Sequence, residues 1–112
     1  PEMTVVGHNT ATIRESLLEK AFELGEKFIT ASKEHYDPGI IGPFCLQTCI
    51  DKDMNYSIYD VAPRLGGGTN VHVSVGHPYG NATWRKPVSS GRRIAMELRR
   101  AVEQDRLLEV LT

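Results

Sequence analysis

The sequence has 112 residues and carries 13 Lys+Arg against 14 Asp+Glu, so its formal net charge is −1. This length suffices for one domain with a modest core, and 40% hydrophobic with 24% charged residues is typical of a globular protein. The near-neutral balance argues against a general nucleic-acid or anionic-membrane binder, because both require a basic excess. No apolar stretch approaches the roughly 20 residues of a membrane span. We expect a soluble, cytoplasmic protein.

The chain starts with Pro1 instead of Met, and the β-branched run Thr4 to Val6 follows almost at once. We interpret the sequence as a piece of a longer protein. The run has the composition of a short strand, which the polar segment Gly7 to Thr10 ends.

A long amphipathic helix is predicted over about residues 17–34. Ser16 followed by Glu19 fits a capping box at its start. The turn signal Tyr36 to Gly39 ends it. Apolar or small residues recur between these points at helical spacing, at Leu18, Ala21, Phe22, Gly25, Phe28 and Ile29.

Two segments rich in β-branched and aromatic residues, about 43–51 and 55–64, predict an antiparallel hairpin. Cys45 and Cys49 lie in the first segment. Residues four apart on a strand are separated by about 13 Å, which is too far for a disulfide. We therefore interpret both thiols as small buried hydrophobes of a reducing compartment.

The remaining residues predict a third strand, a turn-rich connection and a second helix. The strand follows the glycine loop 66–70 and spans residues 71–75, and the connection 76–87 carries Trp84, either as a core residue or as part of a contact surface. The second helix covers about 90–104, and a short helical turn follows it. The order β-α-β-β-β-α predicts an α+β fold.

The hairpin also predicts a metal site. If the chain turns through the two-residue loop Asp53–Met54, Gln47 lies opposite Asp60, with Cβ atoms about 5 Å apart. Two adjacent oxygen donors suit a hard cation such as Mg²⁺. The alternative is that Asp60 only caps the turn after its strand.

The residues that follow Asp60 indicate an anion-binding site. Arg64 lies four residues beyond it, and a triple-glycine loop follows. Gly67 and Gly68 allow a bulky anion to approach the backbone, and Asn70 adds an amide at the end of the loop.

Arg92 and Arg93 occupy the first turn of the predicted second helix, where the helix dipole disfavours each cation by about 0.3–1 kcal/mol. A phosphate or carboxylate bound there would offset this cost, so Arg92 is a phosphate candidate. The alternative is that the arginines are exposed or pair with carboxylates elsewhere. Of the histidines, His8 lies in a polar loop before Arg14 that is a candidate ligand contact, whereas His72 reads as a solvated strand residue or a substrate contact.

Three long segments carry a resemblance to a known family. They are GIIGPFCLQ (residues 39–47), YDVAPRLGGGTN (59–70) and PVSSGRRIAME (87–97). They resemble the C-terminal portion of the archaeal formate-dependent 5-formaminoimidazole-4-carboxamide ribonucleotide synthetase family, which are ATP-grasp ligases. The resemblance implies that residues 1–112 form the C-terminal ATP-grasp subdomain, an antiparallel sheet packed with two main helices. The N-terminal domain and most of the ATP lid would lie upstream.

The resemblance also implies a reaction. ATP phosphorylates formate to formyl phosphate, and the amine of 5-aminoimidazole-4-carboxamide ribonucleotide attacks it to give a formylated precursor of IMP. Mg²⁺ or Mn²⁺ would be held by Gln47 and Asp60, and Arg64 would lie near the transferred phosphoryl group. His8 and Asn9 fall where the family contacts the ribonucleotide, and Arg14 lies in the matching segment before the first helix. The family favours a homo-oligomer, and this chain alone would be inactive.

Three positions depart from the family pattern. Gln47 stands where ATP-grasp enzymes usually carry a carboxylate, Ala62 where many have asparagine, and His8 where we expect asparagine. Losing a negative charge weakens a cation site. Two alternatives follow, a divergent paralogue that joins another acid and amine, or a non-catalytic nucleotide-binding or assembly module.

Overall fold

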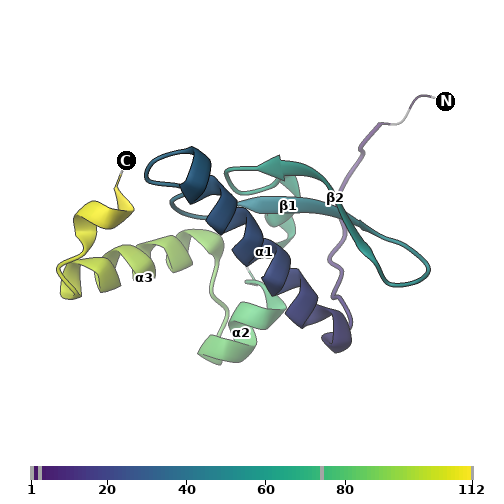
Figure 1. The fold of residues 1–112 in the computed structure, drawn as a ribbon. Coiled ribbons are helices and arrows are strands. Elements are labelled where there is room, and N and C mark those ends of the chain that lie inside the picture. The colour runs from purple at the N-terminus through teal and green to yellow at the C-terminus, as the bar shows by residue number, and fades with distance from the viewer. Residues whose placement is uncertain (1, 3, 74, 112) are drawn as a thin grey trace. The chain divides into compact units, whose positions relative to one another are not determined.

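The computed structural model describes residues 2, 4–73 and 75–111. The chain forms two compact units, one of Ile13–Gly66 and the other of Gly67–Val110 together with the N-terminal residues up to Thr12. The first unit holds a long helix and a two-stranded sheet, and the second holds helices (Figure 1). The predicted α+β class is confirmed. In the part of the chain that the structure describes, no helix is long and apolar enough to cross a membrane.

Helix α1 spans Glu15–His35 and confirms the predicted helix, with an earlier start. The capping box is wrong, because Arg14 is the N-cap and Ser16 lies inside the first turn. No side chain caps the helix. Instead, the Arg14 carbonyl accepts from the Leu17 amide at 2.9 Å, and Glu15 places a favourable negative charge in the first turn.

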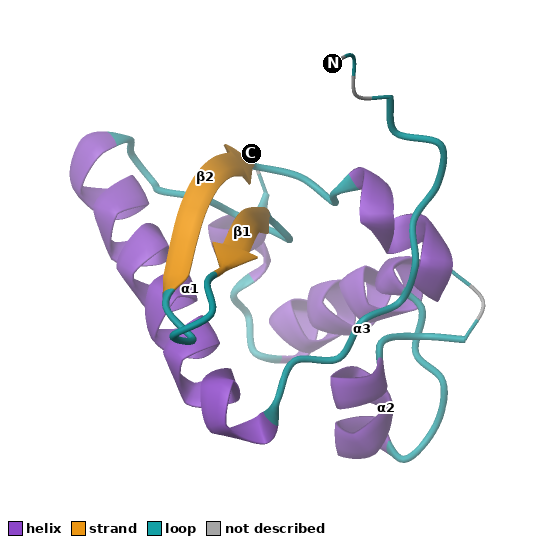
Figure 2. Ribbon diagram, turned by 90° about the vertical axis from the view of Figure 1, so that its right-hand side faces the viewer, coloured by secondary structure: helices purple, strands orange, loops and turns teal. Residues whose placement is uncertain are grey.

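Helix α1 runs alongside the hairpin in both ribbon views (Figures 1 and 2). The Phe28 and Phe44 rings lie 5.0 Å apart, and the Tyr56 hydroxyl donates to the Leu17 carbonyl at 3.2 Å. Leu17 and Ala62 are the buried hydrophobic residues of this unit among those that the structure describes. The helix therefore packs on the hairpin through a thin core.

Strands β1 (Cys45–Ile50) and β2 (Tyr56–Ala62) pair antiparallel, as predicted. The two-residue loop is wrong, because the pairing at the turn is Ile50 with Tyr56 and five residues connect the strands. The Asp51 carboxylate holds this longer turn by accepting from the amides of Asp53 and Asn55 at 2.8 and 2.9 Å. These hydrogen bonds keep the pKa of Asp51 below its ordinary value.

The register then shifts between Gln47 and Thr48, where β2 carries one residue more than β1. Gln47 consequently lies opposite Asp60. The predicted partner pair is thus confirmed although its predicted loop is not, because the bulge compensates for the longer turn.

Both cysteines are free thiols, as predicted. Cys45 is half-buried, but Cys49 is exposed, so its prediction as a buried residue is wrong. The physical reason is that Cys49 belongs to the turn half of the hairpin, residues 48–55, which is exposed throughout.

The predicted strands at residues 4–6 and 71–75 are both wrong. Within the second unit, Gly67–His72 form a 3₁₀-helix, and Ser74 lies outside the described residues. A strand needs a neighbour for its backbone hydrogen bonds, whereas here the Val73 and Gly76 amides bond locally to the carbonyls of Asn70 and His72. Residues 4–6 lie in no described strand.

Helix α2 (Pro78–Trp84) occupies the segment that the sequence predicts as a turn-rich connection. Pro78 stands at its first position, and the His77 ring accepts from the Tyr79 amide at 3.2 Å as the N-cap. Asn81 ties the helix to its flanks by donating to the Val75 carbonyl and accepting from the Val88 amide. Trp84 is half-buried.

Helix α3 (Ser90–Glu103) confirms the predicted second helix, and Ser89 caps it by accepting from the Arg92 amide at 3.2 Å. The predicted final turn is present as the 3₁₀-helix Leu107–Val110. Ala101 is the buried residue of α3 among those that the structure describes. Three other apolar residues of the helix are exposed, Ile94, Leu98 and Val102.

Candidate functional site

Gln47 and Asp60 lie side by side on the hairpin, as the cation site requires. The Gln47 side-chain amide donates from Nε2 to Asp60 Oδ2 at 2.5 Å. Its Oε1 accepts from the Tyr59 hydroxyl at 3.3 Å. Gln47 is half-buried and Asp60 is exposed. The pair is therefore accessible, and each side chain is engaged with its neighbour.

These two residues fit a Mg²⁺ site only in part. The Gln47 amide now presents its nitrogen to Asp60, and a half-turn about its terminal bond would present oxygen instead. Among the residues that the structure describes, no group of three His, Cys, Asp or Glu side chains is placed to hold a metal. Mg²⁺ commonly takes one or two protein carboxylates and completes its shell with water and substrate phosphates. The hairpin suits such a shared site.

Arg64 lies two residues after the end of β2, the strand that carries Asp60. It is exposed, and its Nη1 donates to the neighbouring Leu65 carbonyl at 2.8 Å. The guanidinium can exchange this single local bond for a phosphate at small cost, because a bidentate charge-assisted pair is the stronger interaction.

The structure brings together two segments that the sequence singles out separately. The His8 ring lies against the glycine loop, so that a Cβ on Gly67 or Gly68 would meet it at 3.7 or 3.6 Å. Asn9 and Asn70 are exposed in the same unit, whereas Arg14 belongs to the other unit as the N-cap of α1. The His8 ring and the glycine loop therefore lie close to each other within one unit, at a spacing that a larger residue in the loop would also tolerate.

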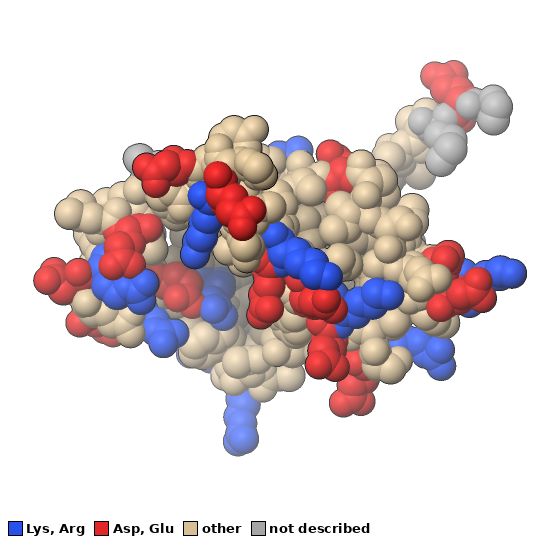
Figure 3. All heavy atoms as spheres, viewed as in Figure 1, with Lys and Arg blue, Asp and Glu red and all other residues tan. Residues whose placement is uncertain are grey.

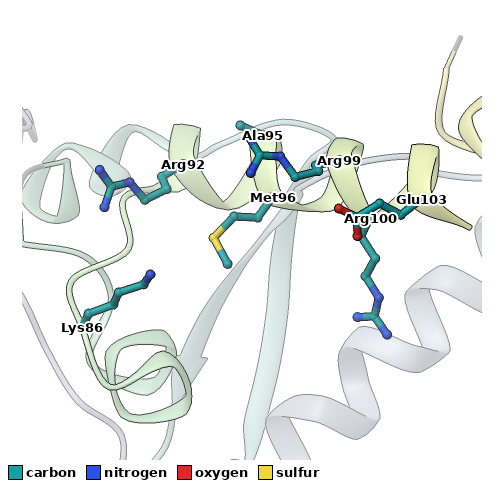
Figure 4. Close-up of a pocket in the computed structure, with 7 residues that line it drawn as sticks. All are labelled: Lys86, Arg92, Ala95, Met96, Arg99, Arg100 and Glu103. Atoms are coloured by element: carbon teal, nitrogen blue, oxygen red, sulfur yellow. The ribbon is translucent and has the colours of Figure 1, made fainter.

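The two arginines at the start of α3 differ. Arg93 pairs with Glu97 at 2.6 Å and lies over the Trp84 ring, 5.3 Å from its centroid. For Arg93 the alternative interpretation, pairing with a carboxylate, is therefore confirmed. Arg92 instead lines an open groove along α3 (Figure 4).

A histidine pair was not predicted. The rings of His72 and His77 meet edge to face at 4.9 Å, and Nδ1 of His72 is buried with no hydrogen-bond partner in the described structure. Burial and the neighbouring His72 lower the pKa of His77. The His77–Pro78 step is a sequence signal for the start of helix α2, because proline is favoured at the first helical position, but it does not reveal the contact with His72.

Charged side chains of both signs are interspersed on the face that Figure 3 shows, as the net charge of −1 suggests. Attraction of a charged ligand therefore depends on local clusters of charge more than on the net charge of the chain.

Comparison with known families decides where the chain belongs. The family model described as "Domain of unknown function (DUF1297)" matches residues 1–112. The chain belongs to this family. A DUF1297 relative from Thermococcus kodakarensis is 44% identical over 114 residues, covering 99% of this chain and 33% of the relative. A relative from Saccharolobus solfataricus is 42% identical over 112 residues, and the match covers 100% of this chain and 33% of that relative.

Both relatives are named 5-formaminoimidazole-4-carboxamide-1-(beta)-D-ribofuranosyl 5'-monophosphate synthetase. The crystal structure of an IMP biosynthesis protein PurP from Thermococcus kodakaraensis matches this DUF1297 chain with a TM-score of 0.80 and 40% identity. That match covers 97% of this chain and 35% of the solved one. The resemblance seen in the sequence motifs is confirmed, and the chain spans about a third of the length of its relatives.

Proposed function

We propose that this DUF1297 chain is the C-terminal part of an ATP-dependent ligase that joins formate to the amine of 5-aminoimidazole-4-carboxamide ribonucleotide in IMP biosynthesis. The observation that carries the proposal is the pairing of Gln47 with Asp60 in a chain that matches the named synthetases along its whole length. The enzyme would work in the cytoplasm as a homo-oligomer of the ATP-grasp class.

The proposed reaction has two steps. A formate oxygen attacks the terminal phosphorus of ATP, the bond to ADP breaks, and formyl phosphate forms. The amine nitrogen then attacks the formyl carbon, loses a proton, and phosphate leaves. Such chemistry depends on positioning and charge stabilisation more than on a protein nucleophile.

Two residues of the hairpin and one that follows it have roles in this proposal. Asp60 and, after its amide turns, the Gln47 oxygen would hold Mg²⁺ or Mn²⁺. The cation would neutralise charge on the phosphate oxygens. Arg64, released from the Leu65 carbonyl, would bind the transferred phosphoryl group.

The second unit would receive the ribonucleotide. His8 and Asn9 would contact it, and Gly67, Gly68 and the Asn70 amide would admit its phosphate to the loop backbone. Arg14 and Arg92 are further candidates for anionic groups. The residues that grip ATP would come from the other two thirds of the protein, so we expect the 112-residue chain alone to be inactive.

The test is phosphate release by the intact parent protein with Mg²⁺, ATP and the ribonucleotide, with and without formate. We expect release that requires formate, and a loss of at least about 100-fold in Asp60→Asn, the size of effect that removing one charge-stabilising group produces. Asp53→Asn is the matched control, because Asp53 is an exposed carboxylate of the hairpin turn outside the site. Full turnover in Asp60→Asn would refute the site assignment.

A second function is favoured by the hydrogen bond between Gln47 and Asp60. Because the two side chains bind each other, neither is free to bind a cation in this arrangement. In that case the parent protein binds nucleotide but does not turn it over, as a binding or assembly module. Formate-independent binding without phosphate release would support this alternative. Release with acetate or another small acid in place of formate would instead identify a ligase for a different acid.

A further inference from the structure

An open groove of about 500 Å³ runs along one face of α3 (Figure 4). Three arginines of α3 line it, at Arg92, Arg99 and Arg100, and Lys86 joins them from the segment before the helix. Met96 forms its apolar part, and Glu103 is its acidic residue. The groove belongs to one compact unit and shares no residue with the Gln47–Asp60 pair.

The charges around this groove are unbalanced. Four cations face one carboxylate, and among the described residues none of the four forms an ion pair. Glu103 lies at the helical spacing that suits Arg99 and Arg100, yet neither pairs with it.

Three surface cations outside the groove form ion pairs. Arg93 pairs with Glu97, Lys27 with Glu23 and Arg106 with Glu109, at 2.6, 2.6 and 2.7 Å. Lysines and arginines elsewhere, such as Lys52 and Arg85, are also without an ion pair among the described residues, so what distinguishes the groove is that it gathers four cations around one carboxylate. Repulsion among them is relieved if an anion binds.

The dimensions restrict which anion fits. A helix rises about 1.5 Å per residue, so Arg92 and Arg100 are about 12 Å apart along the axis and the cations are spread over about two helical turns instead of gathering at one point. Figure 4 shows Lys86 and Met96 pointing into the same space beside the helix. The volume lies in the range of small-molecule sites, and guanidinium groups bind phosphate oxygens in pairs. The overall charge of −1 disfavours nucleic acid.

We propose that this groove binds a small anion with two or more linked phosphates, held by Arg92, Arg99, Arg100 and Lys86 over Met96. The proposal does not depend on the ligase function, because it concerns binding by one unit and needs no turnover.

The test is calorimetric titration of the intact parent protein with inorganic tripolyphosphate in the absence of divalent cations. We expect Arg99→Gln and Lys86→Gln each to weaken binding roughly tenfold, the usual effect of removing one hydrogen bond to a charged group. Arg106→Gln is the matched control, because it removes the same charge from an exposed, paired arginine outside the groove. Orthophosphate should bind at least tenfold more weakly than tripolyphosphate.

The opposite results would overturn the proposal. Absence of tripolyphosphate binding, equal weakening in Arg106→Gln, or equal affinity for orthophosphate would each exclude a built polyphosphate groove. So would a change of oligomeric state in Arg99→Gln with unchanged tripolyphosphate affinity, since the groove would then be a protein contact. Circular dichroism of each variant separates a lost ligand from a lost fold, because the substituted side chains are all exposed.

Discussion

The two units of this chain hold their candidate site residues in opposite states. In Ile13–Gly66, Gln47 and Asp60 are bonded to each other, so that a cation must displace an existing contact. In the unit of Gly67–Val110, the groove cations have no ion pair among the described residues, so that an anion adds contacts without breaking one. Solvent exposure alone therefore does not show whether a side chain is free to bind a ligand. The Gln47–Asp60 pair must first break its own hydrogen bond, whereas the groove cations need break no ion pair.

The largest expected effect is a loss of thermal stability in the unit of Gly67–Val110, caused by a single substitution within it. Gly76 has φ +72, and a Cβ there would lie 2.7 Å from the Val88 amide and overlap Asn81 Oδ1. Gly76→Ala should destabilise the second unit by about 3 kcal/mol, because it adds backbone strain to a steric clash. The fluorescence of Trp84, the chain's single tryptophan, reports on this unit, and its thermal transition should fall by more than about 10 °C.

Gly80→Ala is the control for that comparison. A Cβ at Gly80 meets nothing within 4 Å, and the residue lies inside helix α2. The substitution should leave the transition unchanged or raise it slightly, because alanine favours helix over glycine. An equal fall in both variants would show that the unit tolerates no change in this segment and that the contact of Gly76 is not the cause.

A smaller effect should sharpen the contrast between the closed pair and the open groove. Gln47→Glu places two carboxylates opposite each other on the hairpin, which should lower stability by up to about 1 kcal/mol. Mg²⁺ should reverse this loss, because it bridges the two groups. Thermal melts with and without Mg²⁺ at fixed ionic strength measure both effects.

Thr48→Glu is the matched variant, since Thr48 is exposed on the same strand and lies opposite Ile58. It adds the same charge without a facing carboxylate. If Mg²⁺ stabilises both variants alike, the hairpin pair is not a cation site.

The smallest effect concerns pH. Burial and the nearby His72 hold the pKa of His77 below its ordinary value of 6.5, so the unfolded chain takes up a proton more readily than the folded one. This contribution to stability is present above pH 6.5 and is lost as the pH falls below it. The melting temperature should fall between pH 7 and pH 5, by less in His77→Asn, which keeps an N-cap acceptor. An unchanged slope in His77→Asn would contradict this origin.

The hairpin shows how a sequence prediction can reach the right pair through a wrong turn. The prediction paired Gln47 with Asp60 from an assumed two-residue loop, whereas the actual five-residue turn depends on hydrogen bonds that the Asp51 side chain makes. The bulge near Tyr59 then shifts the register by one residue. The turn is fixed by local hydrogen bonds that the prediction did not include, whereas the bulge depends on the fit of two whole strands and is not contained in a local pattern.

The sequence by itself determined the elements that form from their own residues. Helix α1 follows from its apolar spacing, and helix α3 lies close to the predicted range 90–104, because helix hydrogen bonds are local. Tertiary structure decided whether the alternating run 71–75 would find a strand partner, and the described residues of that run pair with no strand. It also decided the approach of His8 to the glycine loop and the gathering of Lys86 with the α3 arginines. The contact of His8 joins segments distant in the chain, and the position of Lys86 depends on how the chain turns into α3, so neither geometry is encoded by a single element.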